Sequence, residues 1–460
     1  MLKDDYSGLV SLFPDGAQTV FRAQENRTRR VTLLKGDLVG NTRTESRGVN
    51  ARVMRKGMSG FASLSGLEAD DAKQVIEAAS ENARFLADRA QRSADYAAAG
   101  SGLITPDRLI EDAPQKALID AAKAVDAYIE KKYPELSSRR IVCYEDSMDK
   151  IIYSSDAASG HVTYPRCYIY IILNAETKGG VPVEVFKAFG GAGSFRDNFE
   201  DPAKLFGEAD KLYEQLRAKQ EGVYAEAGLK TVLIGGLLGG MLAHEAVGHT
   251  VEADLVLGGS VAGPSLGKRV ASDLVSIVDY AHTAFGETAP LPVYLDDEGV
   301  VAEDAVLIKD GFLRGYMNNR ESALKFGVAP QGNARGWNFS DEPLIRMRNT
   351  CILPGRDKLE DMIASIDDGY YLLDSGNGQA DLTGEFMFGV TMGYEIKNGK
   401  LGRALLDTTV TGIAFEMLKT VDMVSDTVTW SSSGFCGKKQ PMPVGMGGPD
   451  IRCKIMIGGR

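Results

Sequence analysis

The amino-acid sequence predicts an α+β protein with two domains. The N-terminal domain is expected to be α/β, with helices packed on a sheet. The C-terminal domain is expected to be mostly β, sandwich-like or barrel-like, and to carry one helix with two histidines. Three observations predict this architecture. The chain has 460 residues, more than one hydrophobic core usually supports. Long segments with apolar residues at helical spacing occur only before about residue 220, and short apolar segments separated by turn residues fill the rest. We therefore expect domains at residues 1–222 and 223–460, the first being either one unit or two, 1–110 and 111–222.

The first domain is expected to combine helices with several strands. Residues 67–89 are rich in Ala, Glu and Leu with apolar positions at helical spacing, which predicts an amphipathic helix. A second helix is expected at 114–132, ahead of Pro134, and a charged helix at 202–220 leads into the second domain. Strand-like apolar content marks five further segments, 31–39, 48–54, 141–145, 150–155 and 162–174. The glycines within 57–60 and 190–193 predict turns.

The second domain is expected to be built mainly from short strands. Residues 232–234 predict a buried strand, and paired glycines lead from it into the helix with the histidines. Further strands are expected at 293–295, 305–308, 312–316, 370–373, 386–396, 403–410 and 451–457. Residues 309–311 and 397–400 predict hairpin turns, because Gly or Asn supplies the positive φ that a tight turn needs.

Composition and charge narrow the classes of function. Hydrophobic residues make up 44% of the chain and charged residues 25%, which is typical of a soluble globular protein. The net charge of −11 argues against nucleic acid or an anionic membrane as the main partner. The apolar run at 231–243 is too short to span a bilayer, and acids stand where a signal peptide needs a basic start. Five scattered cysteines without a CxxC pair fit a reducing compartment, so we expect a cytoplasmic protein.

Two of the four histidines flank a glutamate in the stretch HEAVGH at residues 244–249. Two imidazoles and a carboxylate form the residue set of a hydrolytic zinc site, in which neutral nitrogens bind the metal and the acid takes a proton from water. Five steps of about 100° along an ideal α-helix, however, place the two imidazoles roughly 140° apart. Either the histidines are polar caps on a helix end, or the helix is overwound or bulged between them. Gly248 is where such a distortion costs least.

A hydrolytic zinc needs a third ligand from elsewhere in the chain, because it keeps three protein ligands and one water. His161 and His282 have no local pattern that supports them, and most of the cysteines are interpreted as small core residues. Cys436 lies in a glycine-flanked segment from which its thiol could reach outward, and Lys438 is near enough to favour the thiolate. Cys436 is therefore the candidate that the local sequence supports.

Several segments resemble the TldD/PmbA family of zinc metallopeptidases, specifically its TldD-like catalytic branch, and they keep the family order. These segments are HEAVGH…VEAD at 244–254, LDDEG at 295–299, LIKDG at 307–311, RMRNT at 346–350 and CGK…PVG at 436–445. The resemblance covers residues 230–460, and residues 46–62 look like the N-terminal domain of the family. Two departures, at Lys439-Gln440 and Ala334-Arg335, leave the metal residues intact and leave the substrate preference open.

The resemblance implies that His244, His249 and Cys436 bind zinc and that Glu245 is the catalytic general base. It also implies a dimer, either a homodimer or a heterodimer with a non-catalytic TldE/PmbA-like paralogue, that encloses the zinc and admits only extended or unfolded peptides. Glu252 is either a partner that orients one of the histidines or a solvated acid on the helix face. The expected activity is zinc-dependent hydrolysis of peptide bonds.

Two other functions compete with the peptidase. One is a non-catalytic PmbA-like partner subunit, and the other is a zinc hydrolase that cleaves a non-peptide amide. Partner subunits of the family lack the HExxxH set, so the intact stretch at 244–249 disfavours the first. The second shares the metal chemistry and differs in substrate alone.

Overall fold

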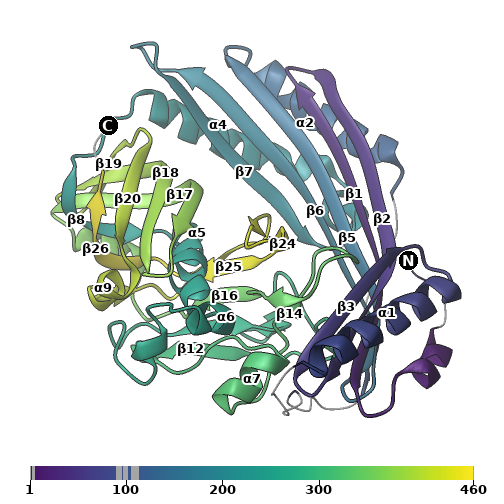
Figure 1. Ribbon diagram of the computed structural model, residues 1–460. Helices are drawn as coiled ribbons and strands as arrows, with labels where there is room; N and C mark the ends of the chain where they lie inside the picture. The colour runs from purple at the N-terminus through teal and green to yellow at the C-terminus, as the bar shows by residue number, and fades with distance from the viewer. Residues whose placement is uncertain (1, 3–5, 90–95, 97–101, 105–112, 459–460) are drawn as a thin grey trace.

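A long curved sheet stands beside a β-rich C-terminal part (Figure 1). The computed structural model describes residues 2, 6–89, 96, 102–104 and 113–458. The predicted α+β class is confirmed, because helices pack on the N-terminal sheet and strands dominate the part of the chain after residue 228. Within the described ranges, no helix is both long and apolar enough to cross a membrane. The expected boundary at residue 222 stays a prediction.

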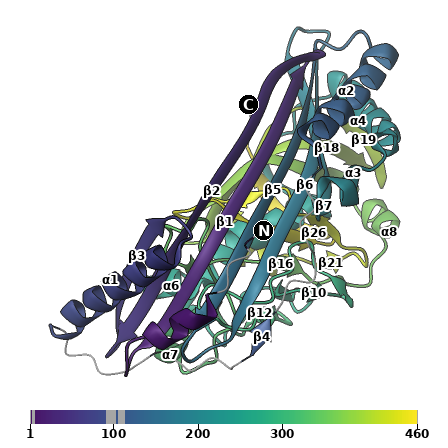
Figure 2. The same ribbon diagram turned by 90° about the vertical axis from the view of Figure 1, so that its right-hand side faces the viewer.

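Seven strands form the N-terminal sheet, in the order β3-β2-β1-β5-β6-β4 with β7 beside β6 (Figures 1 and 2). Their bounds are β1 Gln18–Leu34, β2 Asp37–Arg55, β3 Met58–Ser65, β4 Leu103–Ile104, β5 Ser138–Ser154, β6 Ser159–Glu176 and β7 Pro182–Ala192. All neighbouring strands are antiparallel except β4 and β6. Lys56 and Gly57 both have positive φ and form the two-residue turn between β2 and β3. The turn expected within 57–60 therefore lies one residue earlier, and Gly60 belongs to β3.

The strands are longer than predicted because charged residues occupy many strand positions. The segments expected at 141–145 and 150–155 are one strand, β5, whose pairing with β1 is continuous from Arg140 to Ser154. The acidic stretch between them suggests a break, yet Asp146 and Lys150 are buried in ion pairs with Arg166 and Asp297. Alternation of apolar and polar residues does not reveal a strand whose polar face is covered by another part of the chain. Similarly, residues 190–192 end β7 instead of forming the expected turn.

Three long helices cover one face of this sheet. α1 Ala69–Ala87 packs on β2 and β3, α2 Gln115–Lys132 on β5, and α4 Phe206–Gln220 on β6 and β7 (Figure 2). The three predicted helices are confirmed, with the difference that residues 202–205 form a separate 3₁₀ turn before α4. Apolar side chains such as Ile141 and Ile169 point towards α2 and α4. Because side chains alternate along a strand, the other face of the sheet carries charged and aromatic residues, such as Lys150 and Tyr170, together with aliphatic ones such as Ile172.

Five C-terminal strands close into a barrel in the order β17-β8-β26-β20-β18, with β18 pairing back to β17. The barrel strands and the two that flank them are β8 Gly228–Ile234, β17 Asp368–Ala380, β18 Glu385–Lys397, β20 Thr408–Ile413, β26 Ile451–Ile457, β19 Lys400–Ala404 and β21 Met423–Val424. A second sheet has the order β13-β12-β9-β16-β25-β22. Its strands are β9 Ile277–Tyr280, β12 Ala305–Lys309, β13 Phe312–Leu313, β16 Asn349–Ile352, β22 Thr429–Ser431 and β25 Gly445–Gly448. The helix with the histidines, which begins as α5 Gly236–Leu242, packs between the barrel and this sheet.

Short elements connect the two sheets of the C-terminal part. They are β10 Thr283–Ala284, β11 Glu287–Thr288, β14 Ala334–Arg335, β15 Leu344–Ile345, β23 Phe435–Cys436, β24 Met442–Pro443, α6 Ala253–Leu257, α7 Arg320–Phe326, α8 Leu359–Ala364 and α9 Ala414–Lys419, and α3 Phe195–Phe199 precedes them in the N-terminal part. The strand predicted at 293–295 is wrong, because Leu295 makes only an isolated bridge to Val301. The carboxylate of Asp296 accepts the backbone N–H groups of Glu298 and Val300 and thereby shapes a loop.

Buried ion pairs join the N-terminal sheet to this loop. Nζ of Lys150 donates to the carboxylate oxygens of Asp297 at 2.9 and 2.8 Å, and Arg22 pairs with the same carboxylate. The backbone N–H of Gly336 donates to it at 2.6 Å. All three charged side chains are at most 2% exposed. Burial raises the pKa of Asp297, but Arg22 and Lys150 outweigh it and hold the pKa below its usual range.

Replacing Asp297 by asparagine is expected to lower the free energy of unfolding by about 3–5 kcal/mol, because two buried cations lose their carboxylate. Asp426→Asn is the control, since Asp426 pairs with the exposed Lys358 and its loss costs about 1 kcal/mol or less. Urea unfolding measures both. Because the folded-state pKa of Asp297 is depressed, its contribution is present above the ordinary carboxyl pKa of about 4 and is lost as the pH falls through the folded-state value. Equal effects of the two substitutions would contradict the prediction.

Candidate metal centre

The helix that carries the two histidines changes its geometry between them. α5 continues as a π-helix over Ala243–Gly248 and then as a 3₁₀ turn over His249–Val251. The backbone N–H of His249 donates to the carbonyl of His244. This is the i to i+5 hydrogen bond of a π-turn, which brings residues five apart to the same side of the helix. The predicted departure from α geometry is confirmed, and it takes the form of a bulge.

Close packing explains the glycines before and inside the bulge. A Cβ at Gly240 would lie 2.8 Å from the backbone nitrogen of Gly447 in β25. A Cβ at Gly248 would overlap Sδ of Met347, the end of a flexible side chain that would have to move. Gly240 therefore needs a residue without a side chain for the helix to pack against β25, because backbone cannot give way there.

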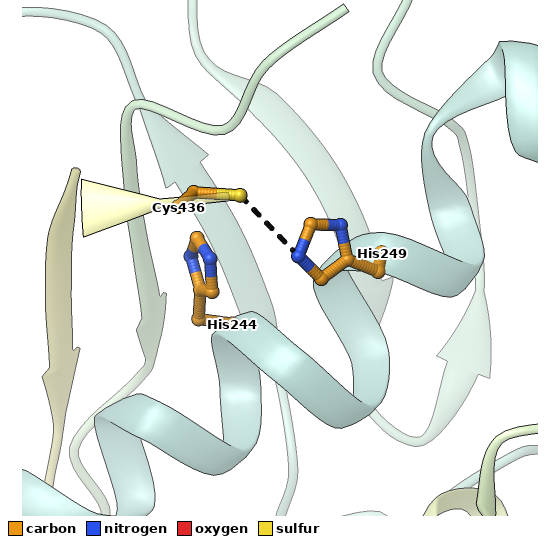
Figure 3. Close-up of side chains that lie close together, drawn as sticks. All are labelled: His244, His249 and Cys436. Atoms are coloured by element: carbon orange, nitrogen blue, oxygen red, sulfur yellow. Dashed lines mark hydrogen bonds between the residues drawn. The ribbon is translucent and has the colours of Figure 1, made fainter. Parts of the chain in front are cut away.

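Three side chains converge at the bulge: His244, His249 and Cys436 (Figure 3). One potential ligand atom from each lies within 4.8 Å of the other two. Sγ of Cys436 is 3.4 Å from Nε2 of His249, and the centroids of the two imidazole rings are 5.2 Å apart. The fold thus brings together the three residues that the sequence singles out, although 187 positions separate His249 from Cys436.

The donor atoms fit a tetrahedral zinc ion. Zn–N bonds of about 2.0 Å and Zn–S bonds of about 2.3 Å place a nitrogen and a sulfur ligand roughly 3.5 Å apart, and the observed separation is 3.4 Å. His244 is only 1% exposed, and neither of its ring nitrogens has a hydrogen-bond partner in the described part of the chain. A buried polar group without a partner is costly. The imidazole of His244 is therefore arranged to offer a nitrogen to a bound ion.

Charge also favours a cation at this point. Burial raises the pKa of the Cys436 thiol, but the neighbouring imidazoles of His244 and His249 outweigh burial and bring it to about 3. Burial lowers the pKa of His249, but Cys436 and Glu252 outweigh it and raise the pKa to about 10. Both shifts favour a thiolate at Cys436, which is the form in which cysteine binds a metal. Cys436 is 2% exposed and its thiol points towards His249 (Figure 3), which corrects the expectation that it reaches outward.

Glu245 lies at the more exposed side of the cluster. Its Oε1 is 3.9 Å from Nε2 of His244, and its Oε2 is 3.6 Å from Nε2 of His249. Its side chain is 24% exposed, whereas that of His244 is 1% exposed. A carboxylate at these distances can exchange a proton with a water molecule held next to the cluster.

Glu252 is buried and orients His249. Its Oε2 accepts a hydrogen bond from Nδ1 of His249 at 2.7 Å, which leaves Nε2 turned towards Cys436. The side chain of Glu252 is 0% exposed, so the interpretation as a solvated acid is wrong. Nζ of Lys438 lies 3.1 Å from Glu252 and 3.1 Å from Asp254. Lys438 therefore pairs with these acids, and the imidazoles, not Lys438, account for the lowered pKa of Cys436.

Replacing Glu252 by glutamine is expected to weaken metal binding by about 10- to 100-fold, because the acceptor of the His249 ring N–H loses its charge. Competition with a fluorescent zinc chelator measures the change. Asp254→Asn is the matched control, since Asp254 also contacts Lys438 but is 40% exposed and has no contact with His249. If both variants bind zinc as tightly as the wild type, Glu252 does not orient a ligand.

A buried arginine holds the segment that contains Cys436. Nη2 of Arg346 donates to the carbonyl of Cys436 at 2.6 Å. Nη1 of the same guanidinium donates to the carbonyls of Lys438 and Gln440 at 2.9 and 2.8 Å. Arg346 is 0% exposed. Arginine is rarely fully buried, so the sequence does not predict this contact. The position of Arg346 in the RMRNT segment is the single signal for it.

The N-terminal sheet holds the residues just before Cys436. Oη of Tyr168 donates to the carbonyl of Ser432 at 2.6 Å, and Nη1 of Arg166 donates to the same oxygen at 3.0 Å. Oη of Tyr170 donates to the carbonyl of Ser433 at 3.1 Å. Residues from both parts of the molecule therefore fix the position of the thiol.

The other two histidines lie outside the cluster. Nε2 of His161 is 2.5 Å from Oδ1 of Asp149 on the adjacent strand. His282 stacks on Tyr294 with ring centroids 4.9 Å apart. Neither residue belongs to the group that could hold a metal.

Comparison with known proteins gives consistent results along the chain. Three family models match it: PmbA/TldA metallopeptidase domain 1 at residues 20–83, the central domain at 107–227 and the C-terminal domain at 227–459. A metalloprotease TldD homolog of Haemophilus influenzae is 36% identical over 255 residues, which are 55% of this chain and 52% of that protein, so the match spans about half the length of this relative. A zinc metalloprotease TldD homolog of Saccharolobus solfataricus is 30% identical over 338 residues, 73% of this chain and 74% of that protein. The crystal structure of TldE from Thermococcus kodakarensis has the same fold, with a TM-score of 0.75 and 17% identity over 98% of both chains.

Proposed function

The chain belongs to the PmbA/TldD metallopeptidase family, and on this premise we propose that it is a zinc-dependent peptidase that hydrolyses extended or unfolded peptides. One observation carries the proposal: His244, His249 and Cys436 converge, and Glu245 lies beside them. Two nitrogens and one thiolate leave a coordination position free, as a catalytic zinc site requires. The name of the Saccharolobus relative, a zinc metalloprotease, supports the same choice of metal.

Each residue of the site has a proposed role. His244, His249 and Cys436 hold the metal, and Glu252 keeps Nε2 of His249 free for it. When bound, zinc supplies Lewis acidity, which makes a peptide carbonyl easier to attack. Glu245 accepts the proton of the attacking water and later delivers it to the nitrogen of the leaving amine.

The substrate and the assembly are part of the proposal. A peptide bound as an added strand gains affinity from its backbone with little demand on its sequence, which suits unfolded substrates. The similarity to TldE over nearly the whole chain supports a partner of the same architecture. We therefore propose either a homodimer or a heterodimer with a TldE/PmbA-like paralogue, in which the zinc faces an enclosed cavity. Neither nucleic acid nor a membrane has a part in this assembly.

Metal analysis combined with a cleavage assay tests the proposal. Purified protein, alone and mixed with the paralogue, is assayed for zinc and incubated with an unstructured peptide and with a folded domain that contains the same sequence. We expect about one zinc ion per chain and cleavage of the unstructured peptide only. Absence of zinc would refute the proposed enzymatic function. Bound zinc without peptide cleavage under either condition would favour a partner subunit or a hydrolase of non-peptide amides.

A further inference from the structure

A groove of about 600 Å³ runs over the N-terminal sheet on the face opposite to the helices. We call it the sheet groove; its walls include Tyr144, Tyr170, Phe186 and Phe435, and Arg30 and Arg140 stand beside them. Strand register explains why they meet. Arg30 is opposite Tyr144 between β1 and β5, and Arg140 and Phe186 are both opposite Ile172 of β6. Opposite residues in an antiparallel pair share a face of the sheet.

The sheet groove adjoins the candidate metal centre. Phe435 immediately precedes Cys436, is 38% exposed, and meets the ring of Tyr144 edge-on with centroids 6.2 Å apart. Ser433 also lines the groove, and its carbonyl accepts the hydrogen bond of Tyr170. One wall of the groove is therefore the segment that carries the thiolate. An extended peptide advances about 3.3 Å per residue, so a substrate at the metal centre reaches the groove within a few residues of the bond that is cleaved.

Aromatic side chains form walls of the groove, and the basic side chains of Arg30 and Arg140 lie beside them. Phe186 is 37% exposed, although a side chain of this size gains from burial. Neither Arg30 nor Arg140 has an acidic or hydrogen-bonding partner in the described part of the chain. Glu184, the acid in the groove, accepts a hydrogen bond from Nδ2 of Asn174 at 2.8 Å. In a chain of net charge −11, two unpaired guanidinium groups beside exposed aromatic rings form a local site for an anion with an apolar neighbour.

We propose that the sheet groove binds a bulky apolar side chain of the substrate peptide together with an adjacent carboxylate, which Arg30 and Arg140 hold. This inference rests on the proposed peptidase and gives it a substrate preference. The carboxylate comes either from an acidic residue or from the C-terminus of the peptide. The proposal excludes the alternative that a second subunit fills the groove.

Competition between peptides tests the proposal. Unstructured peptides that carry Phe-Glu, Ala-Glu, Phe-Gln or Phe-Lys at one position, with free or amidated C-termini, are mixed with the zinc-loaded protein, and the relative kcat/KM values are measured by mass spectrometry. We expect Phe to be preferred over Ala by about tenfold. A preference for Glu over Gln identifies the acidic residue as the source of the carboxylate, and a preference for the free over the amidated end identifies the C-terminus. Equal rates for all peptides would overturn the proposal.

Variants connect the preference to the groove. Phe186→Ala is expected to remove most of the preference for Phe, whereas Phe85→Ala, at a 55% exposed site on α1, leaves it unchanged. Arg30→Glu with Arg140→Glu is expected to reverse the charge preference, so that Phe-Lys is cleaved faster than Phe-Glu. Lys178→Glu with Lys187→Glu is the control, because it makes the same change of charge outside the groove. Zinc content and circular dichroism confirm that each variant is folded.

Binding measurements separate this inference from the proposed function. Anisotropy of labelled peptides with zinc-loaded Glu245→Gln protein reports peptide preference without cleavage. If the wild type cleaves no peptide but the groove variants change binding as expected, the proposed peptidase function is wrong and the groove assignment stands. If peptides are cleaved but neither set of groove variants changes the preference, the groove assignment fails alone. A change of oligomeric state without a change of preference would mean that the groove is a subunit interface and would overturn the proposal.

Discussion

Replacement of Cys436 by serine is expected to release zinc and abolish peptide cleavage. Removal of one of three protein ligands costs more than loss of a residue that only orients a ligand, so the zinc affinity falls by more than about 100-fold. A neutral hydroxyl also replaces the thiolate that the neighbouring imidazoles favour. Chelator competition gives the affinity, and cobalt substitution gives a second readout, because a thiolate-to-metal absorption band is present only if sulfur binds the ion.

Cys351→Ser is the matched control for this prediction. Cys351 is buried as well, and burial raises the pKa of its thiol to about 12, but it lies in β16 and outside the cluster. The control variant should bind zinc and cobalt as the wild type does. If Cys436→Ser kept both its zinc and the cobalt–sulfur band, the third ligand would be another residue.

Replacement of Glu245 by glutamine is expected to keep zinc and to lower kcat/KM for an unstructured peptide by about 10²- to 10⁴-fold, because glutamine cannot accept the proton of water. The side chain is partly exposed and its oxygens are 3.6 and 3.9 Å from the imidazole nitrogens, so the change disturbs neither histidine. Zinc content and steady-state kinetics are measured on the same preparation.

The comparison with Glu252→Gln makes this test specific. Both substitutions remove one carboxylate next to His249, but Glu252 bonds to Nδ1 and Glu245 lies near Nε2. Glu252→Gln should lose zinc affinity and recover activity when zinc is added, whereas Glu245→Gln should stay inactive at any zinc concentration. Activity of Glu245→Gln within a few-fold of the wild type would exclude it as the general base.

Local pattern predicts a large part of the fold. The three helices of the N-terminal part and the final strand, β26, follow from the spacing of apolar residues. The sequence predicts the long strands β1 and β5 only in pieces, because residues such as Arg22 and Lys150 face Asp297 in the C-terminal part of the chain instead of water. The sequence does not show which distant residue pairs with a charged side chain and thereby offsets the cost of burying it.

The candidate site likewise combines features that the local sequence predicts with features that it does not. The spacing in HEAVGH demands a distorted helix if both histidines are to face one ion, and the π-turn between them meets this demand. The roles of Arg346 and Lys438 could not be predicted, because they depend on contacts between segments that are far apart in the chain. Lys438 was expected to act on Cys436, its near neighbour in sequence, and instead pairs with Glu252 and Asp254.

The sequence by itself determined the candidate residues, the need for a bulge and the family resemblance, since these depend on short motifs in which the residues stand within a few positions of one another. Only the tertiary structure decided that the thiol of Cys436 meets His249 across 187 residues and that Glu252 is a buried partner of His249. It also decided that the sheet groove opens beside the segment that carries Cys436. The physical reason is that the bulge follows from hydrogen bonds between near neighbours in the chain. The cluster and the groove follow from the packing of the N-terminal sheet against the C-terminal part of the chain, which leaves no local pattern in either.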